Sequence, residues 1–287
     1  MNKRLDIQKT YKLYINGKFP RTESGRYFPL HDSDENLIAN ICQASRKDFR
    51  EAVKAARNAT PEWSAKTAYN RGQIIYRIAE TMEGRKKQFV EELVNMGIAR
   101  KNATKEVDIS LDRLVYYAGW TDKFQQLFST VNPVSSSHYN FSTPEYQGVI
   151  AIIAPDFNPL LALVSLIAPS IASGNTVVCL ASSKSPLSSI SFAEVLHTSD
   201  IPAGVVNILT GFVSELAEHF SSHMDVNGIV CCEDHTDQFK FIQENAAENV
   251  KRVHYYNTYN WMDNNAQSPY FIIDHTEIKT TWHPVGS

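Results

Sequence analysis

The sequence has 287 residues, which is room for one large domain or two small ones built around a substantial hydrophobic core. Its 43% hydrophobic and 21% charged residues are typical of an ordinary globular protein and exclude a disordered chain. The formal net charge of -3 provides no summed positive field to hold a polyanion. Small molecules or proteins are therefore expected as partners, and nucleic acid is not.

The chain contains four cysteines, Cys42, Cys179, Cys231 and Cys232. They are too few and too irregularly spaced for a disulfide scaffold, and the adjacent Cys231 and Cys232 cannot easily bridge each other. This usage is typical of a reducing compartment. The N-terminus lacks a following apolar run, and no stretch of the sequence reaches the length needed to span a bilayer. The sequence therefore predicts a cytoplasmic protein without a membrane partner.

The N-terminal region begins with a β-prone segment that runs into Asn16-Gly17, a pair that tolerates positive φ and favours a hairpin turn. Ser45 is placed to cap a helix, and Thr60-Pro61 has the pattern of a second helix start. Two helices are therefore predicted to begin within a short distance of each other.

Farther along the chain, apolar residues recur at steps of three and four over 70–82 and 107–118, which predicts two amphipathic helices. A polar break over 135–137 precedes two extended pieces, one over 138–141 and one beyond residue 144.

After Gly148 the pattern changes to short apolar runs that alternate with helical segments. Their connections are too long for hairpins, so they predict right-handed βαβ units and an α/β fold with a parallel sheet covered by helices. Strands are predicted over 149–153, 176–180, 205–209, 229–231 and 252–255, and helices over 159–172, 186–198, 213–222 and 236–247.

The C-terminal part begins with a polar segment over 257–267 that carries two large aromatic side chains and is predicted to cross the surface. Two extended pieces follow, over 270–273 and 276–282. The alternation in the second piece is typical of a half-buried or edge strand.

Ligands of open parallel sheets bind beyond the carboxyl ends of the strands, so the loops there are the places to search for chemistry. The loops over 154–159, 181–186 and 232–235 contain no G-x-G-x-x-G motif. In the last of them Glu233 and Asp234 would cap the following helix themselves and repel a phosphate.

Other constellations are weaker. His219 and His223 lie four residues apart on a predicted helix but lack the glutamate of a hydrolytic zinc motif, so a solvated helix face is the favoured interpretation. A zinc site using Cys232 and His235 has a spacing that fits no common finger or ribbon. Lys184 precedes a helix start but is expected to be solvated. No metal is predicted, and no cysteine has the surroundings of a nucleophile.

The sequence nevertheless resembles the aldehyde dehydrogenase superfamily. The motifs that carry this resemblance lie at Gly148–Pro155, Pro159–Leu161, Ile167–Val178, Pro186–Ser188, Ile201–Ile208 and His223–Val226, in the cofactor domain, and at Tyr14–Lys18 and Ala118–Trp120 upstream. The resemblance implies a Rossmann-like parallel sheet flanked by helices, with an N-terminal helical part. Residues 277–282 resemble the oligomerisation strand of the superfamily, partnered by the region of Tyr139 and Val149.

The departures from the family pattern concern its functional residues. Phe157 aligns with the asparagine that contributes to the oxyanion hole, and Asn158 stands one place late. Leu180 and Ser183 align with the lysine and glutamate that grip the adenosine ribose. The glycine-bearing loop of the family aligns with 232–238, which contains no glycine.

The segment 257–268 stands where the family carries an entire catalytic domain with its cysteine nucleophile and general-base glutamate, so that domain is expected to be absent. The combination looks most like the degenerate C-terminal unit of aldehyde dehydrogenase family 16. The implied organisation is an N-terminal helical part over 1–134, an oligomerisation hairpin over 135–147, a Rossmann-like cofactor-type domain over 148–256, a linker over 257–269 and a C-terminal oligomerisation strand over 270–287.

The expected function is that of a pseudoenzyme without a cofactor, retained for assembly with a second copy or an aldehyde-dehydrogenase-like chain, or for protein binding. Its expected contacts are Tyr139, Phe141, Ile278, Thr280 and Trp282, unless Trp282 merely packs on its own sheet. The alternative is an oxidoreductase that uses NAD or NADP to act on aldehydes and is completed in trans by a full-length partner.

Overall fold

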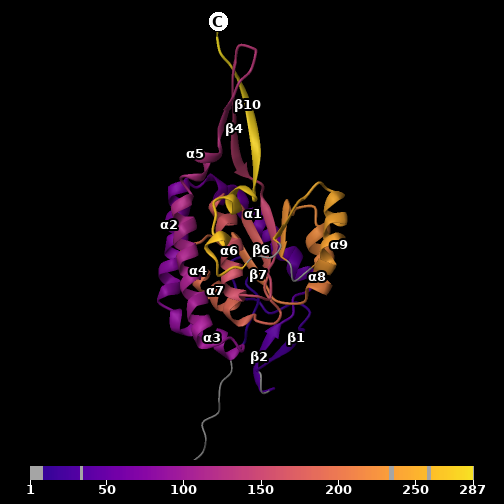
Figure 1. Cartoon of the computed structure of the whole chain (residues 1–287). Coiled ribbons are helices and arrows are strands. Elements are labelled where there is room, and N and C mark those ends of the chain that lie inside the picture. Colours follow the sequence, from indigo (N-terminus) through magenta and orange to yellow (C-terminus); the bar gives the residue numbers. More distant parts are fainter. Residues whose placement is uncertain (1–8, 33–34, 233–235, 257–259, 287) are drawn as a thin grey trace, which may run out of the picture.

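The computed structural model describes residues 9–32, 35–232, 236–256 and 260–286 (Figure 1). A five-stranded parallel sheet with the order β7-β6-β5-β8-β9 forms its centre. The strands are the predicted apolar runs, and the predicted α/β class is confirmed. Their bounds are β5 (Val149–Ile153), β6 (Thr176–Leu180), β7 (Val206–Leu209), β8 (Gly228–Cys232) and β9 (Arg252–Tyr256).

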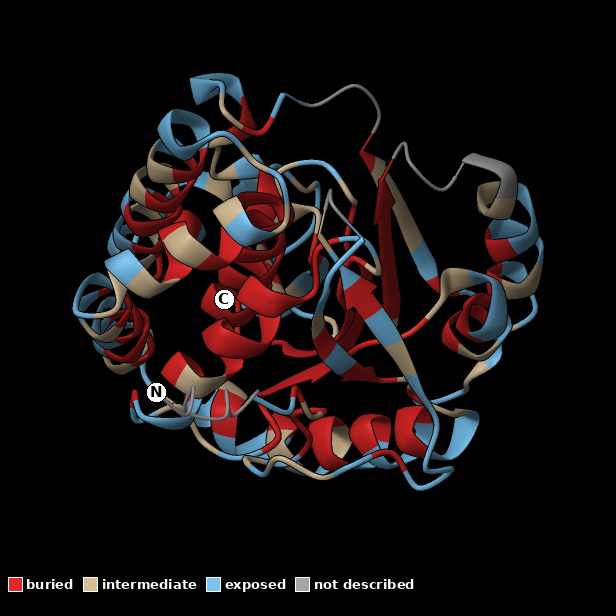
Figure 2. Ribbon diagram, turned by 90° about the horizontal axis from the view of Figure 1, so that it is seen from below, coloured by how far each residue is buried: buried red, intermediate tan, exposed pale blue. Residues whose placement is uncertain are grey.

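Helices cover both faces of this sheet (Figures 1 and 2). One face packs against α6 (Pro159–Ala172) and α7 (Leu187–His197), and the other against α1 (Arg46–Ala65), α8 (Val213–Ser222) and α9 (Thr236–Ala247). Alternate residues of each strand enter opposite cores. In β5, Ile150 and Ile152 face α6 and α7, whereas Val149, Ala151 and Ile153 belong to the core beneath α1 and α8. Burial on both faces explains why β5, β6, β7 and β8 are dominated by apolar residues, whereas the edge strand β9 is only partly buried and carries Arg252 and His254.

A second layer of helices lies outside α6 and α7. It consists of α2 (Ala68–Glu83), α3 (Lys86–Asn95) and α4 (Arg100–Trp120), followed by the short α5 (Phe124–Phe128). The two predicted amphipathic helices are α2 and α4. The predicted apolar stripe of α2 is buried, and that of α4 is buried at Val107, Leu111 and Leu114 but not at Val115, which is exposed.

Helix α1 begins as predicted but does not end where a second helix was expected. Ser45 Oγ accepts a hydrogen bond from the Asp48 backbone N–H, and the Asp48 carboxylate accepts one from the Ser45 N–H, which completes a capping box. The prediction of a new helix start at Thr60-Pro61 is wrong, because α1 continues through Pro61 to Ala65. Trp63 is fully buried in the next turn and donates to the Ile171 carbonyl, so tertiary packing outweighs the break that proline favours.

The predicted turn at Asn16-Gly17 is confirmed. Both residues have positive φ, 52° and 68°, and Ile15 and Lys18 exchange two backbone hydrogen bonds of 3.0 Å. Nearby, β1 (Tyr27–His31) and β2 (Leu37–Cys42) form a two-stranded antiparallel sheet.

A separate antiparallel sheet with the order β10-β4-β3 projects from the body of the molecule (Figure 1). It contains β3 (Thr130–Asn132), β4 (His138–Tyr146) and β10 (Thr276–Pro284), and β10 pairs with β4 along its whole length. The two extended pieces predicted beyond residue 137 are therefore one strand, and the edge strand predicted at 276–282 is confirmed. We call β4 and β10 together the ribbon.

The prediction of a strand over 270–273 is wrong, because these residues form the short helix α10 (Tyr270–Ile273). Phe271 and Ile272 are both buried. Neighbouring side chains point to opposite faces of a strand, whereas a helical turn lets both face the core. In the part of the chain that the structure describes, no helix is long and apolar enough to cross a membrane.

Candidate functional site

The carboxyl edge of the parallel sheet is formed by the ends of β5, β6 and β8. The strand order changes direction at β5, whose neighbours are β6 on one side and β8 on the other. This is the topological switch point at which open α/β sheets bind ligands. The loops over 154–158 and 181–186 lie here and lead into α6 and α7.

These two loops are bonded to each other through Asp156. One carboxylate oxygen of Asp156 accepts a hydrogen bond of 2.6 Å from Ser182 Oγ, and the other forms an ion pair of 3.0 Å with Lys184 Nζ. Ser182 Oγ also accepts from the Ser185 backbone N–H at 3.1 Å. The Lys184 side chain is 77% exposed, as expected, and its ammonium group also has a carboxylate partner.

Phe157 and Asn158 follow directly. Phe157 is 60% exposed and has no group that donates a hydrogen bond. Asn158 has a φ of 48°, in the left-handed region, and its Nδ2 lies 3.5 Å from a carboxylate oxygen of Glu106. The only amide side chain in this loop therefore faces a buried acid.

Glu106, on α4, occupies the N-terminus of α6. It is fully buried and accepts backbone hydrogen bonds from Leu160 at 3.0 Å and Leu161 at 3.2 Å. Burial raises the pKa of its carboxyl, and the two N–H donors partly offset that rise. The sequence analysis missed this role. The signal was a polar stripe on the buried side of α4, in which Glu106, Ser110, Arg113 and Tyr117 follow at steps of four, three and four.

The remaining positions at which the sequence departs from the family pattern lie close by or outside the described residues. Leu180 ends β6 and is buried in the core beneath α1. Ser183 is partly exposed in the loop that follows. Glu233 and Asp234 lie outside the residues that the structure describes, and so does His235.

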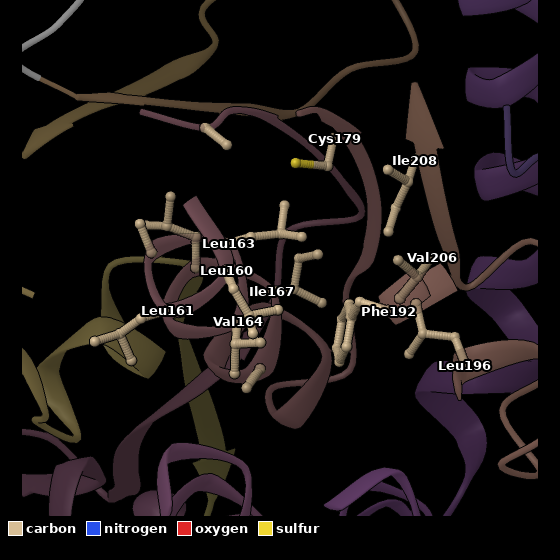
Figure 3. Close-up of a cluster of buried hydrophobic side chains, with 14 of the residues drawn as sticks. Leu160, Leu161, Leu163, Val164, Ile167, Cys179, Phe192, Leu196, Val206 and Ile208 are labelled. Carbon is tan, nitrogen blue, oxygen red and sulfur yellow. The ribbon is translucent and has the colours of Figure 1, made fainter. Parts of the chain in front are cut away.

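All four cysteines of the chain are buried, as predicted for Cys42 and Cys179 and for the strand residue Cys231. Cys179 points into the aliphatic cluster between β6 and α6 (Figure 3). Burial raises the pKa of the Cys179 thiol and raises that of Cys231 to about 12. Because the thiolate is the reactive form, these groups are unreactive core side chains. Cys231 and Cys232 belong to opposite cores.

Among the described residues, no three side chains of the histidine, cysteine, aspartate and glutamate types come together as metal ligands. His219 lies in the last turn of α8, and His223 is the residue that follows the helix. Of the candidate zinc pair, Cys232 is buried and His235 lies outside the described part of the chain.

The five side chains expected to form an interface lie on the ribbon but on opposite faces. In the register of β4 and β10, Phe141 pairs with Thr281, whereas Trp282 pairs with Asn140 and Ile278 with Pro144. Paired residues share a face and successive residues alternate. One face therefore carries Ile278, Thr280 and Trp282, and the other carries Tyr139 and Phe141. Ile278 and Trp282 are 56% and 57% exposed.

Trp282 lies against one ring of its own sheet, that of His138, at 5.8 Å between centroids, and the rest of its surface faces solvent. Between Ile278 and Trp282 the same face carries hydrogen-bonded polar side chains. Asn132 Nδ2 donates to Asn140 Oδ1 and to Ser142 Oγ, and Ser142 Oγ lies 2.8 Å from Thr280 Oγ1.

The root of the ribbon is attached to the parallel sheet by Asn175, which is fully buried at the start of β6. Its Oδ1 accepts from the backbone N–H groups of Gln147 and Gly148, both at 2.8 Å. Its Nδ2 donates to the carbonyl of His275 at 2.6 Å. One side chain thereby joins the end of β4, the start of β5 and the start of β10.

The described part of the segment that leads into α10 was predicted to cross the surface, and it lies at the surface at residues 260 and 263–265 but not at Trp261 and Ala266. Trp261 is buried, and Arg113 of α4 donates to the carbonyls of Trp261 at 3.0 Å, Asp263 at 3.2 Å and Ala266. Arg113 also donates to Ser165 Oγ on α6 at 3.0 Å. The segment is polar in its side chains, but it is fixed to the core through its backbone.

The model of the Aldehyde dehydrogenase family matches residues 21–260 of this sequence. The chain belongs to the aldehyde dehydrogenase family. The family therefore covers the region of β1 and β2, the outer helices, β3 and β4, and the whole parallel sheet. The match ends before α10 and β10.

Known proteins support the same assignment. The chain is 34% identical to Aldehyde dehydrogenase, cytosolic 1 of Elephantulus edwardii over 87% of this chain and 50% of that protein. It is 33% identical to Cytosolic 10-formyltetrahydrofolate dehydrogenase of Mus musculus over 88% of this chain and 28% of that protein. An aldehyde dehydrogenase from Bacillus cereus, solved as an NAD+ complex, superposes with a TM-score of 0.82 at 28% identity and covers 87% of this chain and 51% of that one. The chain spans about half the length of the aldehyde dehydrogenases it matches, and less of the longer formyltetrahydrofolate enzyme.

Proposed function

We propose that this chain is a non-catalytic member of the aldehyde dehydrogenase family, a pseudoenzyme of the kind represented by the degenerate unit of family 16. The observation that carries this proposal is that all four cysteines are buried. The family resemblance implies a cysteine nucleophile, and a thiol that attacks an aldehyde must be accessible and easily deprotonated. None of the four thiols is accessible, and burial raises the pKa of two of them, Cys179 and Cys231.

Three features at the carboxyl edge of the sheet support the absence of a dinucleotide site. Leu180, at the position of the family's ribose-binding lysine, is an aliphatic side chain buried in the core. Glu106 already accepts hydrogen bonds from the backbone N–H groups at the start of α6. Asp156 binds Ser182 and Lys184, two of the polar groups of these loops. The described residues at this edge therefore do not fit NAD or NADP.

Calorimetric titration of the intact chain with NAD and with NADP tests the proposal. We expect no binding heat at millimolar cofactor, whereas a full-length aldehyde dehydrogenase titrated in parallel gives a clear isotherm. A micromolar affinity for either cofactor would overturn the pseudoenzyme assignment.

We further propose that the segment over 257–269 replaces the catalytic domain of the family. Under this proposal residues 1–134 are the helical part, 135–147 the oligomerisation hairpin, 148–256 the cofactor-type domain and 270–287 the oligomerisation strand. The hydrogen bonds from Arg113 to the carbonyls of Trp261, Asp263 and Ala266 support it, because they fix the described residues that precede α10 against α4.

The role we assign to such a chain is assembly, with a second copy or with an aldehyde-dehydrogenase-like partner. The ribbon supports this role, since β10 is the outer strand of its sheet and presents an unpaired edge beside the exposed Ile278 and Trp282. Size-exclusion chromatography with light scattering, comparing the intact chain with one that ends before Thr276, provides the test. A monomer in both samples would remove the assembly proposal.

The second candidate is an oxidoreductase that acts on aldehydes with NAD or NADP and is completed in trans by a full-length partner. The names of the relatives favour it, and so does the coverage of about half of their length. Mixing the chain with a full-length aldehyde dehydrogenase and following reduction of the cofactor distinguishes the two. A rate above that of the partner alone would support the enzyme. A cytoplasmic location, in line with the cytosolic relatives by name, belongs to both proposals.

A further inference from the structure

A pocket of about 330 Å³ lies between the first turns of α1 and the end of α8, and it shares no lining residue with the loops over 154–158 and 181–186. Its lining includes Arg46 and Arg50 from α1 and His219 and His223 from α8 and the residue after it. Among the described residues, no carboxylate belongs to this lining. A volume of this size suits a small molecule.

The cationic side chains of the pocket are poorly neutralised. Arg46 has no hydrogen bond or ion pair with any described residue, and Arg50 has only a 3.7 Å contact with the exposed Glu51. The nearby carboxylate of Asp225 is engaged by Arg57, whose Nε lies 3.5 Å from it. A guanidinium without a carboxylate partner retains its full attraction for an anionic ligand.

A buried ammonium group adds to this charge. Lys251 is only 8% exposed, and its Nζ has no hydrogen-bond partner among the described residues. Burial lowers the pKa of the His223 imidazole, Asp225 raises it, and the positive charges of Lys251, Arg50 and Arg57 lower it further. Asn249, two residues earlier, donates to the sulfur of Met224 in the pocket wall. Burying a charged group without a partner costs free energy, and this penalty is smaller beside a site that admits an anion.

The two helix ends at the pocket do not determine whether its electrostatic potential is positive or negative. The N-terminus of α1 carries about half a positive charge, and the C-terminus of α8 about half a negative charge, so their fields largely offset each other. The guanidinium groups of Arg46 and Arg50 are therefore the full charges of the lining, and the nearby Asp48 carboxylate is engaged by the backbone N–H groups of Ser45 and Glu23 and by Thr22 Oγ1.

We propose that this pocket binds the phosphate group of a small phosphorylated molecule, with Arg46 and Arg50 as the contacting residues. The planar guanidinium forks match phosphate oxygens in pairs, and a phosphate carries close to two negative charges at neutral pH. Lys251 supplies a buried counter-charge behind this contact. The site is independent of the cysteines and of the carboxyl edge, so it does not depend on the proposed pseudoenzyme function.

The test uses two double variants of the intact chain that remove the same charge from the same helix. Arg46→Ala with Arg50→Ala removes the proposed contacts, and Lys47→Ala with Lys54→Ala removes two exposed lysines of α1 outside the pocket lining. Each protein is titrated with inorganic phosphate and with glycerol 3-phosphate at constant ionic strength, by calorimetry and by NMR of the histidine side chains.

We expect saturable binding below about 10 mM to the unmodified chain and to the lysine variant, with shifts in the His219 and His223 resonances. The arginine variant should bind at least about tenfold more weakly. Glycerol 3-phosphate binding more tightly than inorganic phosphate identifies an esterified phosphate, and the reverse order would assign the pocket to the free anion. Equal weakening in both double variants, or no saturation in the unmodified chain, would overturn the proposal.

Discussion

Val250 is held at a φ of 59°, in the left-handed region, in the turn between α9 and β9. A side chain branched at Cβ strains the backbone there by roughly 1–2 kcal/mol, whereas glycine adopts this region freely. Val250 is 88% exposed, so its removal costs little packing. Val250→Gly should therefore raise the free energy of unfolding by about 1 kcal/mol, measured by urea denaturation. Val250→Ala keeps a Cβ, so its gain in the free energy of unfolding should be smaller. A loss of stability in the glycine variant would contradict the proposed backbone strain at Val250.

His275 is fully buried at the root of the ribbon, where its Nδ1 lies 3.0 Å from Ser170 Oγ. Burial, with a smaller contribution from the nearby His254, lowers the pKa of its imidazole from 6.5 to about 3. The unfolded chain therefore binds a proton between these values that the folded chain does not. The stability that neutral His275 provides is complete above about pH 6.5 and is lost as the pH falls through this window.

Chemical denaturation at a series of pH values checks this dependence. The free energy of unfolding should fall by up to about 1.4 kcal/mol for each pH unit below 6.5 through this one group. A His275→Leu variant should lose that part of the slope, whereas His283→Gln, at an exposed position of the ribbon, should keep it. An identical slope in all three proteins would show that His275 does not control it.

At the scale of elements, Arg113 holds the segment after β9 against α4 and α6. Replacing it by methionine keeps the aliphatic stem but leaves the carbonyls of Trp261, Asp263 and Ala266 without their donor. Arg113→Met should lower the free energy of unfolding by about 3 kcal/mol and should speed hydrogen exchange over 260–268. Arg77→Met on α2, where the arginine pairs with Glu80 at the surface, should cost under about 1 kcal/mol. Unchanged exchange over 260–268 would contradict the role of Arg113.

The elements that could be predicted from the sequence are those whose own side chains decide the outcome. Strands β5, β6, β7 and β8 are buried along their whole length and are dominated by apolar residues, and Ser45 forms its cap within four residues. The errors arose where distant groups decide. Pro61 stays within α1 because Trp63 is bonded to α6, and the chain after Trp261 is held by a donor nearly 150 residues away.

The features of the candidate site also divide into those that could be predicted from the sequence and those that could not. The burial of the cysteines could be predicted, because a thiol within an apolar strand follows the strand into the core. The bonding of Asp156 to Ser182 and Lys184 could not, since it depends on two loops that meet only in the folded sheet. Glu106 was missed for a related reason. Its partners are backbone N–H groups of another helix, which no side-chain motif records.

At the scale of the whole molecule, the two faces of the ribbon allow the assembly proposal to be tested face by face. Ile278→Ser with Trp282→Ser alters one face, and Val131→Ser with Tyr139→Ser alters the other. The first pair removes the indole and a neighbouring aliphatic group, the type of anchor that dominates interfaces, and should weaken self-association or partner binding at least about tenfold. The second pair is the matched control. Equal effects of the two pairs in light scattering would remove the assignment to the tryptophan face.

The ribbon also has a mechanical consequence. Only Gln147 and Gly148 separate β4 from β5, the innermost strand, which is hydrogen-bonded to β6 on one side and β8 on the other. A pulling force applied to the tip of the ribbon is therefore transmitted along the axis of β5. This force loads the hydrogen bonds to β6 and those to β8 in shear, whereas a force on an edge strand would break its hydrogen bonds one at a time. A partner that binds the ribbon is thus connected directly to β5, the strand that is hydrogen-bonded on both sides.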